Sequence, residues 1–138
     1  MGIKIVGKRE KGQNLVEFAL ILPVFLLLVV GMAEFGRAWM TKNILTGAAR
    51  EAVRAAAVET QANAYNSAKT IADAILVSAS IPVALQVGDF DDSVNTPVPT
   101  VNVSITYSYP IFIANFIPGL PGPNIPLTGT ASMRRERY

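Results

Sequence analysis

Residue types that could do chemistry are few in this chain of 138 residues, because it contains neither histidine nor cysteine. Without cysteine there is no disulfide and no thiolate metal site, and without histidine the commonest general base is missing. The carboxylates of Asp89, Asp91 and Asp92 could supply oxygens to Ca²⁺, but the segment GDFDDS lacks the full loop and the terminal glutamate of a calcium site. We therefore favour a solvated turn there, and we expect no metal, no cofactor and no enzymatic activity.

A second group of residues with possible chemistry lies near the N-terminus, in KGQNLVEF. Gly12 closes a short basic leader, residues 1–12, and an apolar run follows directly. A protease that cuts after Gly12 would leave Gln13 as a new N-terminus, one helical turn from Glu17. Between packed apolar helices, that amino cation and a Glu17 carboxylate could neutralise each other between subunits, which would offset the cost of a buried charge. Gly12 and Gln13 are therefore the predicted processing site, and Glu17 is the predicted assembly residue.

The apolar run that must position Glu17 is long enough to cross a membrane. Between Leu15 and Ala33 the only charge is Glu17, and at about 1.5 Å per residue this segment spans most of a hydrocarbon core of about 30 Å. Basic residues crowd the leader, so the positive-inside rule predicts a cytoplasmic N-terminus. We expect a cleaved leader at 1–12, a transmembrane segment at 13–33 and an extracytoplasmic domain at 34–138.

Two other interpretations of the apolar run are a buried core helix of a soluble protein and a secretory signal peptide. The rest of the chain offers little that could bury such a helix. A signal peptide is disfavoured because the run is longer than a typical h-region. Pro23 removes one helical hydrogen bond and is expected to kink or loosen the helix.

The helical pattern continues beyond the apolar run, and a second helix and a small sheet follow. Apolar residues recur at spacings of three to five as far as Glu59, which predicts one helix over about 13–59. A second amphipathic helix is expected over about 61–79, closed by Pro82. Alternating apolar residues then predict strands over 83–87, 101–109 and 126–134. The expected fold is α+β, with a long N-terminal helix, a second helix and a small antiparallel sheet of about three strands.

Two further surfaces could bind another protein. Ala48, Ala52 and Ala56 make a ridge of small residues on which another helix can approach closely, although alanine is also simply the best helix former. The segment IFIANFIPGLPGPNIP is too rich in proline and glycine for regular structure and too apolar for a free loop. We expect it to cover the small sheet; the alternative is a partner patch at Phe112, Phe116 and Ile117.

The basic residues do not indicate a nucleic-acid partner. The formal net charge of +2 comes from the leader, since the remaining chain has eight basic and nine acidic residues, a balance of −1. Trp39, with Arg37 and Lys42 nearby, suits a membrane interface. We expect the C-terminal arginines to form a solvated end; they are Arg134, Arg135 and Arg137.

Three stretches carry a more specific pattern: GQNLVEFALILPVFLLLVVGMAEFGRAW, LTGAAREAVRAAAV and the closing TGTASMRRE. They resemble the TadE-like proteins, pilin-like components of the tight-adherence (Flp/Tad) pilus system. The resemblance implies cleavage after Gly12 by a prepilin peptidase, and it makes Glu17 the counterpart of the acidic residue that pilin-like subunits use in assembly. It also implies a single-pass protein of the bacterial inner (cytoplasmic) membrane that can enter an extracellular pilus. The implied partners are other pilin-like subunits, an inner-membrane platform and a secretion ATPase.

We therefore expect a structural subunit, minor or major, of a Tad-type pilus or a related secretion system, assembled through its N-terminal helix. The alternative is a single-pass anchor that displays an extracytoplasmic binding module and never enters a filament. That alternative predicts an uncleaved leader and tolerance of substitution at Gly12. An extracytoplasmic enzyme on a tether is disfavoured by the lack of histidine and cysteine.

Overall fold

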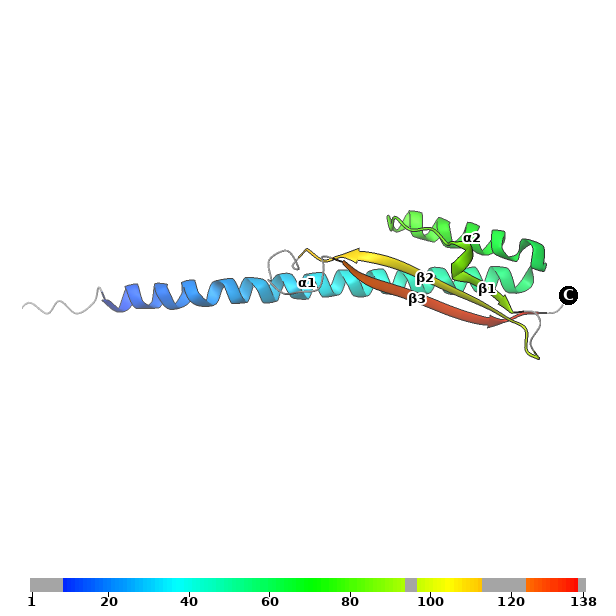
Figure 1. Cartoon of the computed structure of the whole chain (residues 1–138). Helices are drawn as coiled ribbons and strands as arrows, with labels where there is room; N and C mark the ends of the chain where they lie inside the picture. The colour runs from blue at the N-terminus through cyan, green and yellow to red at the C-terminus, as the bar shows by residue number, and fades with distance from the viewer. Residues whose placement is uncertain (1–8, 94–96, 113–123, 137–138) are drawn as a thin grey trace, which may run out of the picture.

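One helix, α1, runs through most of the length of the molecule (Figure 1). Its N-terminal half, residues 9–33, stands alone among the described residues and is called the bare half below; its second half is part of a head formed by helices and a sheet. The computed structural model describes residues 9–93, 97–112 and 124–136. In chain order the elements are α1 (Arg9–Val58), α2 (Gln61–Ser78), the short 3₁₀ helix η1 (Val87–Asp89), β1 (Phe90–Ser93), β2 (Thr100–Pro110) and β3 (Asn124–Arg134). The predicted α+β fold, with its long N-terminal helix, second helix and three-stranded antiparallel sheet, is confirmed.

Both helices begin and end close to where the periodicity predicts. α1 is 50 residues long and continues through Pro23. It ends at Val58, and Thr60 then takes an extended backbone conformation that starts α2. Because only two residues separate the helices, α2 folds back alongside the second half of α1 (Figure 1).

Alanines bring α1 and α2 close together in the core of the head. On each helix, buried alanines spaced four residues apart form one ridge along the helix; they are Ala48, Ala52 and Ala56 on α1, where Ala49 and Ala57 are buried as well, and Ala64, Ala68 and Ala72 on α2. Small side chains let two helix backbones approach. Larger fully buried side chains complete the core: Leu45, Val53, Leu76, Leu85, Val101, Val103 and Ile105.

The sheet covers the helices with one face and turns the other face outward. Its strand order is β1-β2-β3, and both neighbouring pairs are antiparallel. Along β2 the burial alternates, with Val101, Val103 and Ile105 in the core. On the outer face, the hydroxyls of Thr106 and Thr128 lie 3.0 Å apart in a hydrogen bond. This period of two is the pattern that predicted β2 and β3 from the sequence.

Gly129 in β3 marks the closest approach between the sheet and α1. A Cβ on Gly129 would lie 2.7 Å from the Cβ of Leu45, and nearer still to the backbone of Leu45 and Thr46. Non-bonded carbon atoms prefer separations of about 3.5–4.0 Å. Strand β3 therefore rests directly on the backbone of α1, and only glycine fits there without a shift of the strand or the helix.

The strand predicted over 83–87 is wrong. The chain after α2 has no regular structure until η1, and the first strand is β1, which lies further along. The apolar alternation has another cause. Ile81 and Leu85 are buried in the core, and the backbone of Leu85 forms hydrogen bonds with side chains of α2 instead of with a neighbouring strand. Asp92, expected in a solvated turn, lies within β1.

Candidate functional site

The N-terminal half of α1 is a large apolar surface that the rest of the described chain leaves uncovered (Figure 1). Between Leu15 and Val30 its large apolar side chains are 36 to 72% exposed. Burying one such side chain is worth about 1.5–3 kcal/mol, so a surface of this extent needs a lipid or protein environment. By length and composition, α1 is the one helix in the described ranges that could cross a membrane. These are the features of a single-pass membrane protein.

Gly12, Gln13 and Glu17 all lie on this bare half, and all three are exposed. Helix α1 runs unbroken from Arg9 through this stretch, so Glu17 lies one turn beyond Gln13, about 6 Å along the axis. A Cβ on Gly12 would meet nothing within 4 Å. Glycine inside a helix costs about 1 kcal/mol relative to alanine, and contacts with the described residues give no reason for it at Gly12.

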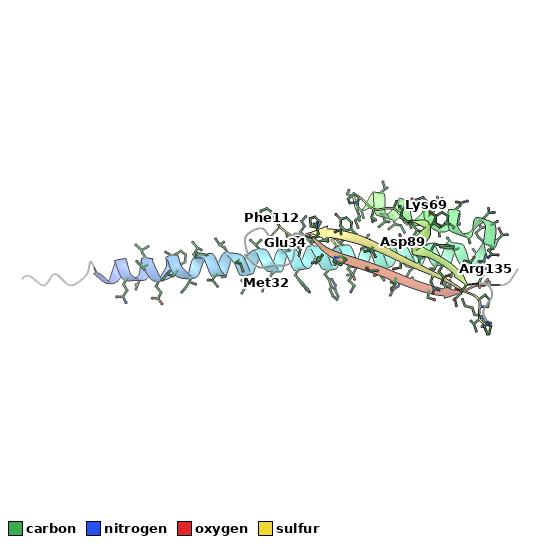
Figure 2. The ribbon with its side chains drawn as sticks, viewed as in Figure 1. Met32, Glu34, Lys69, Asp89, Phe112 and Arg135 are labelled. Carbon is green, nitrogen blue, oxygen red and sulfur yellow. The ribbon has the colours of Figure 1, made fainter. Side chains whose placement is uncertain are left out.

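Glu34 ties the sheet to α1 where the bare half ends. Its side chain is 14% exposed, and its Oε1 lies 3.5 Å from Nη1 of Arg37. The backbone N–H of Phe112, just after β2, donates to Oε2 of Glu34 at 3.3 Å. Figure 2 shows Glu34 and Phe112 together at the edge of the head. No sequence pattern indicated the contact with Phe112.

The other predicted contact residues fall in separate places. The ridge of Ala48, Ala52 and Ala56 is buried in the core that α1 shares with α2. Phe112 is 59% exposed. Phe116 and Ile117 lie outside the described residues. Within the described part of the predicted patch, Phe112 is thus the side chain that an apolar partner could contact.

Arg135 joins three parts of the head at the end remote from the bare half (Figure 2). Its guanidinium forms an ion pair with Asp92 of β1 and donates a hydrogen bond of 2.7 Å to the backbone carbonyl of Glu59, after α1. Its own backbone N–H donates to the carbonyl of Pro99 at 2.8 Å. Arg135 is 8% exposed, so the prediction of a solvated end is wrong at this residue. The spacing of charges could not show that the end of β3 reaches the turn between the helices.

Two side chains of α2, Lys69 and Asp73, bind the backbone of Leu85, which is buried in the core; we call this pair the polar clasp. The Lys69 ammonium donates to the Leu85 carbonyl at 3.0 Å and to Asp73 at 2.7 Å, while the Leu85 N–H donates to Asp73 at 2.9 Å. The hydrogen bond to Asp73 is the largest cause that raises the pKa of Lys69 above 10.5, and desolvation acts in the opposite direction. With both backbone groups of Leu85 bonded to side chains, this segment needs no strand partner.

Each carboxylate of the acidic segment around β1 has a bonding partner within the head. No group of three or more acidic side chains in residues 9–93, 97–112 and 124–136 is arranged to hold a metal ion. The three carboxylates have different partners: Asp89 accepts from the N–H of Gln86 at 3.2 Å, Asp91 from the hydroxyl of Ser93 at 3.1 Å, and Asp92 from Arg135.

The geometry defines a class of protein, namely a single-pass membrane protein whose α+β head is built around the continuation of its apolar helix. A family model described as TadE-like protein matches residues 12–54. The resemblance to the TadE-like family that the sequence indicated is thereby confirmed over residues 12–54 of α1. No curated protein and no solved structure matched the chain.

Proposed function

We propose that this chain is a structural, pilin-like subunit of a tight-adherence (Flp/Tad) pilus or a related secretion system, with no catalytic role. The observation that carries the proposal is the continuity of α1, which is bare and apolar in its first half and forms part of the head's core in its second half. Because α1 is continuous, a displacement of the bare half is transmitted to the head by the same helix. That coupling suits a subunit that leaves a bilayer and enters a filament through its N-terminal helix.

The proposal includes removal of residues 1–12 by a prepilin peptidase at the cytoplasmic face of the inner membrane. Gly12 supports it, because a glycine that no contact with the described residues requires weakens the helix locally. Proteases bind extended substrate, so a weak helical turn lowers the cost of unwinding at the cut. After cleavage the protein retains Gln13 as its first residue, with the head outside the cytoplasm. An inner-membrane platform and a secretion ATPase are the further partners that the family implies.

Glu17 is proposed to neutralise the new N-terminal amino group of a neighbouring subunit. An acidic residue near the centre of a bilayer costs about 2.5–3.5 kcal/mol, and less near its edge. Glu17 is the single charge between Gln13 and Ala33. Within the described residues, its side chain forms no hydrogen bond or ion pair that could stabilise its charge. A neighbouring amino group would offset its cost in the assembled state, so Glu17 would favour assembly over the free subunit in the membrane.

Mass spectrometry of the assembled protein tests processing. We expect a mature chain that begins at Gln13, and we expect Gly12→Ala to slow cleavage while Gly88→Ala, at an exposed glycine of the head, leaves it unchanged. An intact Met1 in assembled material would refute the processing proposal. An intact leader on a protein found in the membrane alone would instead support the membrane-anchored binding module.

Pilus counts on cells that produce Glu17→Gln test the assembly role. We expect normal membrane insertion but few or no pili, since the glutamine keeps the size of the side chain and removes its charge. Glu51→Gln is the matched control, because Glu51 is an exposed acid of the same helix with Arg54 3.9 Å away. A normal pilus count with Glu17→Gln would remove Glu17 from the mechanism.

A further inference from the structure

Exposed apolar side chains from two distant parts of the sequence lie at the same end of the head, the end that faces the membrane. Phe35, Trp39 and Met40 lie on α1, and Phe112 follows β2; all four are 58 to 69% exposed. We call these four residues the basal patch. The hydrogen bond from the Phe112 N–H to Glu34 holds the β2 end of the patch at the level where the bare half of α1 ends (Figure 2).

The length of α1 puts the basal patch at the level of lipid headgroups. The predicted span ends at Ala33, so Phe35 lies about 3 Å beyond it and Trp39 about 9 Å beyond it along the axis. The headgroup layer on each side of a bilayer is about 5–8 Å thick. Side chains of a helix lean toward its N-terminus, which here is the membrane side. The ring of Trp39 accordingly reaches back to stack on Phe35, with ring centres 6.1 Å apart.

The charges around the patch suit phosphate groups. Between Phe35 and Arg50 the chain contains basic residues and no acid. Arg37 and Lys42 are exposed in this stretch, and a basic residue near an anionic bilayer surface contributes about 1 kcal/mol to binding. Glu34, the one acid at the boundary, forms an ion pair with Arg37 and accepts a hydrogen bond from the Phe112 N–H. Anionic headgroups would therefore meet positive charge.

We propose that the basal patch is a lipid-docking surface, in which Phe112 enters the headgroup layer beside Phe35, Trp39 and Met40. Two contacts from different elements hold the head against the bilayer and restrict its tilt, whereas a single helix would leave the head free to swing. This inference rests on the proposed membrane span. The occupant of the patch is the lipid surface, and a second copy of the chain is the competing occupant.

The single tryptophan, Trp39, makes the test direct. The full chain is placed in vesicles of phosphatidylcholine and phosphatidylglycerol, with bromine on the lipid chains either close to the headgroup or close to the chain end. We expect a blue-shifted emission that shallow bromines quench more strongly than deep ones. In a Trp39→Phe background, Phe112→Trp should give the same depth preference. Two reference probes frame the result: Phe25→Trp, in the middle of the span, and Val58→Trp, an exposed site at the far end of α1.

The reference probes separate the possible failures. Quenching of Phe25→Trp by deep bromines, with Trp39 and Phe112→Trp as unquenched as Val58→Trp, would overturn the docking surface and leave the span intact. Absence of quenching at Phe25→Trp as well would overturn both. A blue shift that disappears when the number of chains per vesicle is lowered would assign the patch to a second copy, and would also overturn the proposal. Shallow quenching that persists on dilution is the expected result.

Discussion

Replacing Gly129 by alanine tests the closest contact in the head. The added Cβ would lie 2.7 Å from the Cβ of Leu45 and closer to backbone atoms of Leu45 and Thr46, against a preferred separation of about 3.5–4.0 Å. The overlap with Leu45 Cβ is therefore about 1 Å. Because part of the clash is with backbone, no side-chain rotation can relieve it, and β3 or α1 must move.

The expected cost follows from this geometry. Overpacking a core costs about 1–3 kcal/mol when neighbours can adjust, and occasionally more. A backbone clash belongs at the upper end, so we expect Gly129→Ala to lower the free energy of unfolding by about 3 kcal/mol, a large share of the roughly 5–15 kcal/mol of a typical domain. With a urea dependence of about 1–3 kcal/mol per molar, the midpoint should fall by at least about 1 M.

Urea unfolding of the full chain in detergent, followed by near-ultraviolet circular dichroism of the head, measures this change. Gly47→Ala is the matched control, because Gly47 lies in α1 and a Cβ there would meet nothing within 4 Å. That substitution should stabilise the helix by up to about 1 kcal/mol. An unchanged midpoint for Gly129→Ala beside a raised midpoint for Gly47→Ala would refute the direct contact of β3 with the backbone of α1.

Three further predictions concern the polar contacts of the head. Arg135→Met should cost about 3–5 kcal/mol, because it leaves the buried Asp92 carboxylate without its counter-charge; the same urea assay should show no effect of Arg134→Met, and adding Asp92→Leu to Arg135→Met should restore much of the loss. Asp73→Ala should cost about 1–3 kcal/mol, because the N–H of the buried Leu85 loses its acceptor, and an unchanged midpoint would mean that the clasp does not hold Leu85. Because the folded pKa of Lys69 lies above 10.5, its stabilisation is fully present below pH 10.5 and is lost as pH rises through the folded pKa. The difference in thermal stability between the native chain and Lys69→Met should therefore shrink at high pH, and a constant difference would contradict this.

Elements whose burial repeats along a single segment of the chain could be predicted from the amino-acid sequence. The run from Leu15 to Ala33 is apolar on every side of the helix, as a membrane span is, and its large apolar side chains are exposed in the structure. Ala64, Ala68, Ala72 and Leu76 recur every four residues and form the buried face of α2, and the period of two in β2 buries every second side chain. Helix and strand periods are properties of a single element, so they can be read without knowing what the element packs against.

Contacts between residues that are far apart in the sequence could be identified only in the tertiary structure. The period of two at 83–87 predicted a strand, yet Lys69 and Asp73 bind the backbone of Leu85 and leave that segment irregular. The sequence predicted a solvated charge at Arg135, but in the structure this residue lies where the end of β3 meets β1 and the turn after α1. Glu34 likewise contacts Phe112 across 78 residues. Such contacts depend on the angles and register at which helices and strands pack, and a linear pattern of residue types does not contain those angles.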